Sequence, residues 1–352
     1  MNSIQPLSEL TTMRVGGTPA EIYIAKTRDD LVEHTLNVWR SGEDWLVLGG
    51  GSNVVIADDV SDLHVIKVEN MGIEPVRNKD DSRVVVRVQA GEDWDGFVNH
   101  TVKAGLAGIE AMSGIPGTVG AAPVQNIGAY GQELSDCLVR LEFVDYETQE
   151  VAILEAKDLQ FGYRDSAIKR GRPGLITWVE FELQKLDGLS RPLYSTQIAA
   201  DLGVAMGAQV PLKDVRDSVL KLRARKGMLL DPNDADSISC GSFFTNPIVS
   251  DRVARTLPED APKYESEEDD GLTVKLSAAW LIENAGIEKG FRIAGSKAAI
   301  SSKHTLAITN TGGATATEIL QLAEYVQMRV SNKYAINLVP EPNLIGFQTK
   351  NV

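Results

Sequence analysis

The stretch from Gly114 to Gly131, which reads GIPGTVGAAPVQNIGAYG, limits the folds open to this chain more than any other. It holds five glycines and two prolines, and no charged residue occurs between Ala111 and Gln132. Because the stretch is apolar, we expect it to be buried. Glycine lets the backbone pass close to a ligand, and amides left unpaired by such turns can bind an anion. Taken alone, the glycine content favours a tight structural crossing between strands.

A second glycine turn occurs earlier, in the segment LVLGGGSNVV from Leu46 to Val55. An apolar strand leads there into three glycines and a second apolar run, so two such turns could clamp an extended diphosphate ligand. Neither turn has the G-x-x-x-x-G-K-[ST] order of a triphosphate-binding loop. The earlier turn also misses the dinucleotide fingerprint G-x-G-x-x-G, because position 54 is valine. Triphosphate hydrolysis and a Rossmann cofactor domain are therefore disfavoured.

The composition narrows the classes of partner. A net charge of −14 argues against non-specific binding to nucleic acid or to an anionic membrane. Cys137 and Cys240 give no disulfide framework, and neither the cysteines nor the four histidines show metal-site spacing, so we expect no metal. We find no signal peptide and no apolar run long enough to span a bilayer. These features predict a cytoplasmic protein.

Helical and strand patterns mix throughout the chain, which predicts an α+β or α/β class. Strands at 45–48, 54–57 and 63–68 indicate a small βαβ-type unit with its glycine turn at a strand end. Thr27 and Asp30 form a capping pair for the first predicted helix. The other expected elements are a hairpin over 138–145 and 151–154, a closing strand over 336–339, and helices over 27–40, 92–104, 213–226, 276–284 and 316–330.

Four polar residues stand in settings that suit chemistry, and each has a structural alternative. The planar fork of Arg164 would match a carboxylate, or would pair with Asp165. Ser242 lies beside two phenylalanines and could donate a proton, or could cap a turn. Glu341 is held between two prolines and is either a directed carboxylate or an exposed one. Lys226 ends a basic helical turn, which suits a phosphorylated ligand or the helix dipole.

Six motifs in order resemble one family: LGGGSN, IPGTVGAAPVQNIGAYGQE, FGYRDS, CGSFFTNP, AAWLIENAG and a terminal PEPNLIG. Over nearly the whole chain they are similar to the UDP-N-acetylenolpyruvoylglucosamine reductases, or UDP-N-acetylmuramate dehydrogenases. The resemblance implies an α+β protein with an FAD-binding fold of the vanillyl-alcohol oxidase type and a separate α+β substrate domain. The implied domains are a first flavin subdomain at 1–68 joined by 331–352, a second at 69–211, and a substrate domain at 212–330.

The resemblance also implies which residues bind the cofactor and the substrate. For FAD these are Leu48, Gly49, Gly50, Gly51, Ser52, Asn53, Ile115, Pro116, Gly117, Gly120, Ala121, Gln125, Asn126, Gly128, Ala129 and Tyr130. For the substrate they are Tyr163, Tyr194, Lys226, Asn246 and Tyr264. Some positions depart from the usual family pattern, namely Met13, Val339, Pro342 and the acidic run Glu265–Asp270.

The implied reaction is the NADPH-dependent reduction of UDP-N-acetylglucosamine enolpyruvate to UDP-N-acetylmuramate in bacterial peptidoglycan synthesis. NADPH would reduce the flavin and leave, and hydride from flavin N5 would then reach C3 of the substrate. Arg164 and Glu341 would stabilise the resulting enolate, and Ser242 would protonate C2. We expect a monomer with no nucleic-acid or membrane partner. Two alternatives stay open: another FAD oxidase of the same superfamily, and a non-catalytic nucleotide-sugar binding protein.

Overall fold

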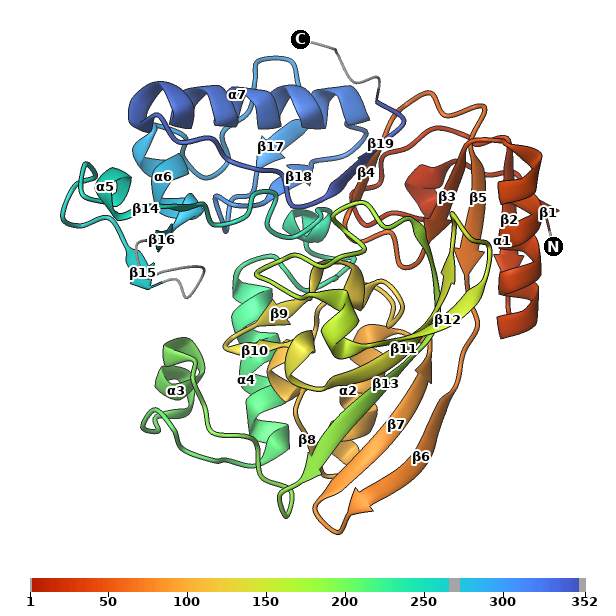
Figure 1. Cartoon of the computed structure of the whole chain (residues 1–352). Helices are drawn as coiled ribbons and strands as arrows, with labels where there is room; N and C mark the ends of the chain where they lie inside the picture. The colour runs from red at the N-terminus through yellow and green to blue at the C-terminus, as the bar shows by residue number, and fades with distance from the viewer. Residues whose placement is uncertain (1, 266–272, 348–352) are drawn as a thin grey trace. The chain divides into compact units, whose positions relative to one another are not determined.

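The computed structural model describes residues 2–265 and 273–347 of the chain. The chain divides into two compact units, each assembled from separate segments (Figure 1). The first comprises Met1–Gln5, Pro19–Gly51 and Ser61–Arg225, and the second comprises Pro6–Thr18, Ser52–Val60 and Lys226–Val352. The predicted three-part division draws other boundaries, because it groups 331–352 with 1–68 and 212–225 with the substrate part, and it stays a prediction.

The first unit begins with a small sheet built on parallel strands. Strand β5 (His64–Val68) lies between β2 (Glu21–Ala25) and β3 (Trp45–Leu48), parallel to both, and β1 (Asn2–Ser3) pairs antiparallel with β2. Helix α1 (Arg28–Ser41) connects β2 to β3 and packs Leu31, Val38 and Trp39 against Ile66 and Val68. The Asp30 amide donates to the Thr27 hydroxyl at 3.1 Å, so the predicted cap is confirmed.

Two sequence expectations about strands are wrong. Strand β4 (Val54–Ile56) does not join β3 and β5 in a βαβ-type unit; it pairs in parallel with β19 (Asn343–Ile345), and both belong to the second unit. Residues 336–339 form no strand: Ile336 and Leu338 are buried in alternation, which imitates a strand pattern, but this stretch has no regular ladder. Pro340 and Pro342 follow this stretch. Because proline has no N–H, neither residue can donate a hydrogen bond to a strand ladder.

The larger sheet of the first unit is antiparallel, in the order β12 (Val151–Glu155), β11 (Leu138–Asp145), β13 (Gly174–Lys185), β7 (Arg83–Gln89) and β6 (Ile73–Asp80). The predicted β11–β12 hairpin is confirmed, and β8 (Leu106–Ala107) pairs with the end of β13. Helix α2 (Trp94–Lys103) covers this sheet through Phe97, whose ring centroid lies 5.1 Å from that of Phe181. Helices α3 (Thr196–Leu202) and α4 (Leu212–Arg225) complete the unit (Figure 1).

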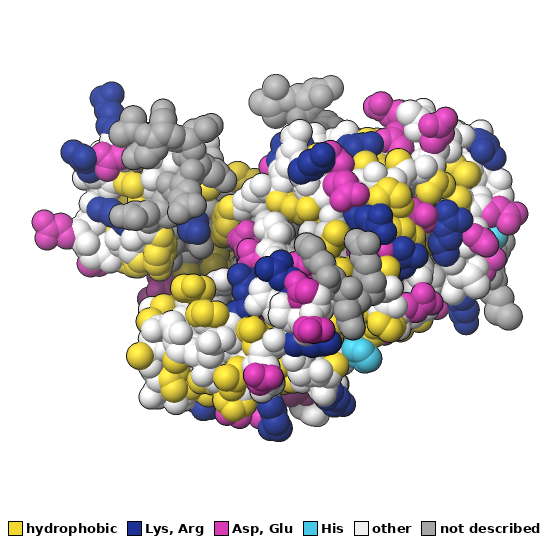
Figure 2. All heavy atoms as spheres, turned by 60° about the horizontal axis from the view of Figure 1, so that its bottom comes forward, with side chains coloured by type: hydrophobic (Ala, Val, Ile, Leu, Met, Phe, Trp, Pro, Cys, Tyr) yellow, Lys and Arg dark blue, Asp and Glu magenta, His cyan; other side chains and the backbone are white. Residues whose placement is uncertain are grey.

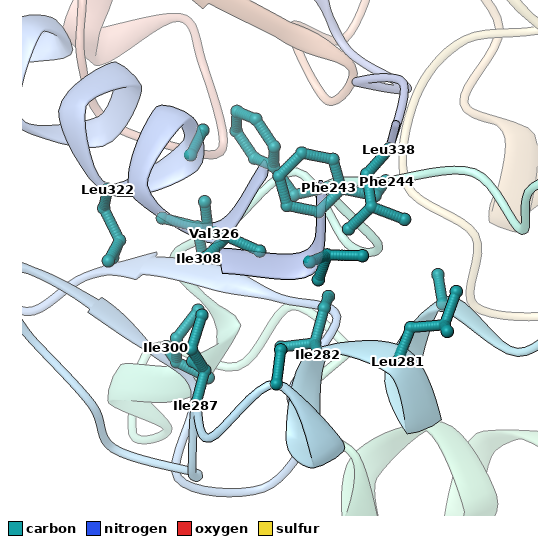
Figure 3. Close-up of a cluster of buried hydrophobic side chains, with 14 of the residues drawn as sticks. Phe243, Phe244, Leu281, Ile282, Ile287, Ile300, Ile308, Leu322, Val326 and Leu338 are labelled. Carbon is teal, nitrogen blue, oxygen red and sulfur yellow. The ribbon is translucent and has the colours of Figure 1, made fainter. Parts of the chain in front are cut away.

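The second unit packs helix α7 (Ala316–Tyr334) over the two-stranded sheet of β17 (Ala298–Ile300) and β18 (Ile308–Asn310). Its core joins Phe243 and Phe244 to Leu322 and Val326 of α7 (Figure 3). A three-stranded sheet adds β14 (Ile248–Ser250), β16 (Thr273–Leu276) and β15 (Lys263–Glu265), and the remaining helices are α5 (Asp251–Ala254) and α6 (Ala278–Asn284). The helix predicted from residue 276 therefore starts at Ala278, because Leu276 ends β16.

Charges are distributed without a dominant basic area on the face that Figure 2 shows, where lysines and arginines are interspersed with aspartates and glutamates. Cys137 and Cys240 are buried free thiols. Within the described residues, no helix is long and apolar enough to cross a membrane. Of the acidic run Glu265–Asp270, only Glu265 belongs to the described residues.

Glu180 is a buried carboxylate at the centre of the larger sheet. Its side chain is 2% exposed and accepts hydrogen bonds from Arg87 on β7, at 2.6 Å, and from Arg140 on β11, at 2.8 Å. Burial alone would raise the pKa of Glu180, but the hydrogen bonds from the two arginines outweigh it and hold the pKa below its ordinary value of 4.5. The charged carboxylate therefore ties three neighbouring strands together.

We predict that Glu180→Gln lowers the free energy of unfolding near neutral pH by about 2 kcal/mol, because two arginines lose a charged partner. The folded-state pKa is depressed, so this stability is present above the unfolded-state pKa and is lost as the pH falls through the folded-state value. Urea unfolding between about pH 7 and about pH 3 tests this. Glu182→Gln is the control, because the Glu182 side chain lies on the same strand and is more exposed. Equal effects of the two variants would contradict the account.

Candidate functional site

The two glycine turns meet in the first unit. A Cβ added to Gly50 would lie 2.6 Å from the Cα of Gly117, and one added to Gly49 would lie 2.3 Å from the Thr118 hydroxyl. Contacts this short exclude any side chain at these positions. The turn after β3 and the Gly114–Gly131 stretch are thus in direct backbone contact, as the diphosphate-clamp hypothesis requires.

Backbone hydrogen bonds hold the middle of the glycine stretch against the end of β7 and the start of α2. The amide of Gly120 donates to the Ala90 carbonyl at 2.8 Å, and the amide of Trp94 donates to the Gly117 carbonyl at 3.0 Å. A Cβ on Gly120 would lie 2.5 Å from that of Ala90. Most of the stretch is buried or half-buried, as expected, and Ala121 and Gly131 are exposed.

Charged side chains hold both peptide groups of Gly114. Its amide donates to Asp95 of α2 at 2.6 Å, and its carbonyl accepts from Arg223 of α4 at 3.1 Å. Asp95 is in turn held by both terminal nitrogens of Arg216, at 2.6 and 2.8 Å. Sequence reasoning missed this arrangement. The available signal was the seven-residue spacing of Arg216 and Arg223, which places both arginines on one face of α4.

The FGYRDS motif is fastened to the glycine stretch by side chains on both sides. Arg164 donates to the carbonyls of Asn126, at 3.3 Å, and of Gly128, and the Asn126 side chain donates to the Gly162 carbonyl at 3.0 Å. The Ser166 hydroxyl donates to the Val124 carbonyl at 2.6 Å. These bonds place Arg164 directly beside residues predicted to bind FAD.

Arg164 has an uncommon backbone conformation, with a φ of 54° in the left-handed region. Its carbonyl accepts from the Lys169 ammonium at 3.1 Å, and its guanidinium carbon lies 5.3 Å from the centre of the Tyr163 ring. Asp165, the alternative ion-pair partner, is paired with Arg170 instead. Arg164 is thus oriented by the carbonyls of the glycine stretch, and its guanidinium also lies 4.0 Å from the Glu133 carboxylate.

In the second unit, the segments that carry Ser242 and Glu341 run antiparallel to each other. The Glu341 amide donates to the Phe243 carbonyl at 2.9 Å, and the Thr245 amide donates to the Val339 carbonyl at 3.0 Å. The Asn53 side chain donates to the Glu341 carbonyl at 3.3 Å. Three predicted site residues from distant parts of the sequence are therefore brought together, while Arg164 belongs to the first unit.

The predicted substrate-binding residues are distributed over both units. Tyr194 of the first unit is 67% exposed and lies against Gly131. A Cβ added to Gly131 would lie 3.2 Å from the Cβ of Tyr194. In the second unit, Asn246 accepts from the Ala278 amide at 3.0 Å and so caps α6, and Tyr264 on β15 is 51% exposed.

Lys226 and Lys289 both act electrostatically on His304, and we refer to these three residues of the second unit as the cationic cluster. Burial, and then the nearby ammonium groups of Lys226 and Lys289, lower the pKa of His304 to about 4. A histidine with this pKa is neutral near pH 7, so the two lysines supply the positive charge of the cluster. Among the described residues, no group of three or more histidines, cysteines or carboxylates could hold a metal ion.

Comparison with known proteins shows the family of the chain. Residues 19–153 match an FAD-binding domain, and residues 231–345 match the C-terminal domain of UDP-N-acetylenolpyruvoylglucosamine reductase. The chain is 50% identical to the enzyme of that name from Leifsonia xyli, over 97% of this chain and 98% of the relative. It belongs to the UDP-N-acetylenolpyruvoylglucosamine reductase family. The predicted family, the α+β fold class with its FAD-binding part, and the FAD cofactor are therefore confirmed.

Further relatives agree along the whole length. The reductase from Thermobifida fusca is 45% identical over 97% of each chain. The crystal structure of the reductase from Thermus caldophilus superimposes with a TM-score of 0.65 at 25% identity and covers 98% of this chain and 99% of the relative. The chain is accordingly an FAD-dependent oxidoreductase of peptidoglycan synthesis. The contact of Gly50 with Gly117 brings the two turns together without a side chain between them, an arrangement that fits a flavin nucleotide bound by backbone amides.

We predict that Gly50→Ala raises the dissociation constant for FAD roughly tenfold or more, because the methyl group forces the two turns apart. Titration of the apoprotein with FAD, followed by flavin fluorescence, measures this. Gly203→Ala at the end of α3 is the control: its φ of 67° adds a backbone strain that Gly50 does not have, and nothing lies within 4 Å of the added Cβ. Unchanged FAD affinity in Gly50→Ala would contradict the diphosphate-clamp hypothesis.

Proposed function

We propose that this protein uses NADPH to reduce UDP-N-acetylglucosamine enolpyruvate to UDP-N-acetylmuramate. The observation that carries the proposal is the backbone pairing of the Ser242 and Glu341 segments, which brings a hydroxyl and a carboxyl onto neighbouring segments of one unit. This pairing occurs in a chain whose relatives bear the name of that reductase along their whole length. The proposed FAD-binding residues are those implied by the resemblance.

The reaction needs a proton donor and a stabiliser of negative charge. When bound and reduced by NADPH, FAD would supply the hydride that C3 of the enolpyruvyl group receives. Addition there leaves negative charge on C2, shared with the substrate carboxylate. We assign protonation of C2 to Ser242, whose half-buried hydroxyl follows Gly241 and precedes two fully buried phenylalanines. Those aromatic rings anchor the serine backbone in the core, so the hydroxyl is preorganised.

Glu341 and Arg164 are assigned to the charge that develops on the carboxylate. The Glu341 backbone is held from two sides, by Phe243 and by Asn53, which fixes where its side chain begins. In its protonated form Glu341 donates a hydrogen bond to the enolate. Arg164 has five N–H donors, and two of its nitrogens donate to the Asn126 and Gly128 carbonyls. Donors of this kind act most strongly on the transition state, where the charge is largest.

Binding of the UDP-sugar is assigned to the residues that the resemblance implies: Tyr163, Tyr194, Lys226, Asn246 and Tyr264. The cationic cluster of Lys226 and Lys289 supports the assignment, because a diphosphate requires local positive charge in a chain of net charge −14. We keep the proposed three-part division, with the flavin part at 1–68, 331–352 and 69–211 and the substrate part at 212–330.

We predict that Ser242→Ala leaves reduction of the flavin by NADPH unchanged but slows reoxidation by the enolpyruvyl substrate at least about a hundredfold, because the proton donor is lost. Stopped-flow absorbance of the flavin resolves the two half-reactions. Ser250→Ala in the same unit is the control, since the Ser250 side chain does not cap α5. A normal rate of reoxidation in Ser242→Ala would remove Ser242 from the mechanism.

We predict that Arg164→Lys slows the same half-reaction about tenfold or more, because a point charge cannot replace the planar guanidinium. Arg170→Lys in the same loop is the matched control, since Arg170 pairs with Asp165 instead of with the glycine stretch. FAD content should be measured in parallel, because Arg164 also contacts that stretch. Near-normal reoxidation with full FAD content would contradict the assigned role.

A wild-type protein that binds FAD but is not reoxidised by the enolpyruvyl substrate would favour another oxidase of the superfamily. One that binds the UDP-sugar without FAD would favour a non-catalytic binding protein. Both measurements use the purified full-length chain.

A further inference from the structure

Lys67 is a partly buried lysine at the ligand-facing end of the parallel strands. It is the second-last residue of β5, and its register partner on β3 is Leu48, directly before the triple-glycine turn. Ligands of parallel sheets bind beyond the carboxyl ends of the strands. Lysine is rarely buried, since the ammonium loses hydration there. Neither the motifs nor the proposed mechanism uses Lys67, so its position calls for an explanation.

The Lys67 ammonium donates a hydrogen bond to the carbonyl of Gly49, the first residue of the turn. Burial lowers the pKa of Lys67, and the neighbouring Glu69 carboxylate opposes this effect. The ammonium is held by this carbonyl, which belongs to the backbone of the predicted FAD site.

A trans peptide group points its C=O and its N–H in opposite directions. Fixing the Gly49 carbonyl therefore also fixes the direction of the Gly50 amide. Among the described residues, that amide has no protein acceptor. Gly50 is also the residue that lies directly against Gly117. The orientation of its peptide group therefore sets the shape of the contact between the two turns.

We propose that Lys67 is a positioning residue for the cofactor: by holding the Gly49 carbonyl, it turns the Gly50 amide toward the FAD diphosphate. The inference rests on the proposed binding of FAD by the triple-glycine turn. The ammonium acts through one peptide group, so it polarises the amide and attracts the anionic diphosphate without touching it. Its effect is on cofactor affinity and not on the chemical step.

The test is a titration of apoprotein variants with FAD, followed by flavin fluorescence, at a temperature where every apoprotein is folded. Lys67→Met removes both the donor and the charge, and should raise the dissociation constant roughly tenfold to a hundredfold. Lys67→Gln keeps a donor without the charge and should recover part of the loss. Lys67→Arg keeps both and should remain within a few-fold of the wild type. Lys185→Met, at an exposed position on β13, is the control.

Thermal unfolding of the same apoproteins separates positioning from simple stabilisation. Lys67→Met with a lower melting temperature but an unchanged FAD dissociation constant would overturn the proposal, as would an effect no larger than that of Lys185→Met. A graded loss of affinity in the order Arg, Gln, Met would support it. A wild-type protein that binds FAD yet fails to reduce the enolpyruvyl substrate would contradict the proposed function and leave the role of Lys67 intact.

Discussion

The first unit depends on the close approach of two backbone turns that carry no side chain where they touch. Gly50 and Gly117 can meet because neither has a Cβ, and the contact tolerates no methyl group. Every other feature of that site serves to keep the turns in place. Asp95 and Arg223 hold Gly114 from both of its peptide groups, and Arg164 and Ser166 fasten the later part of the stretch to the FGYRDS loop. The Gly114–Gly131 stretch is thus held by side chains that bond to its peptide groups.

The second unit brings together side chains that lie far apart in the sequence. The Ser242 and Glu341 segments are paired by backbone hydrogen bonds, and the same pairing anchors Phe243 and Phe244 in the core (Figure 3). Pro340 and Pro342 restrict the backbone on both sides of Glu341. The C-terminal β19 pairs with β4, so the last described strand of the chain stabilises the segment that follows Asn53. Stability and site geometry are therefore coupled in this unit.

Local patterns predicted much of the fold. The Thr27 cap, the β11–β12 hairpin and the long helix from Ala316 follow from periodicity and side-chain chemistry within a few residues. The pairing of β4 with β19 could not be predicted in this way, because its partners are nearly the whole chain apart. The alternation of Ile336 and Leu338 was misleading: their burial follows from packing after α7, and a strand pattern looks the same in the sequence.

The candidate site was predictable only in part for the same reason. Glycines and motif residues can be read from the sequence, but their supports are charged residues whose partners lie elsewhere. Arg216, Arg223 and Lys67 resemble ordinary surface charges until the fold brings Asp95, Gly114 and Gly49 to them. The roles of Arg164, Ser242 and Glu341 in catalysis stay predictions.

A crystal structure of the full-length protein with FAD bound tests the central claim most directly. We predict that the diphosphate oxygens lie within hydrogen-bond distance of backbone amides in both turns, those of residues 49–53 and those of residues 115–118. A diphosphate bound away from these amides, or held by side chains alone, would contradict the account.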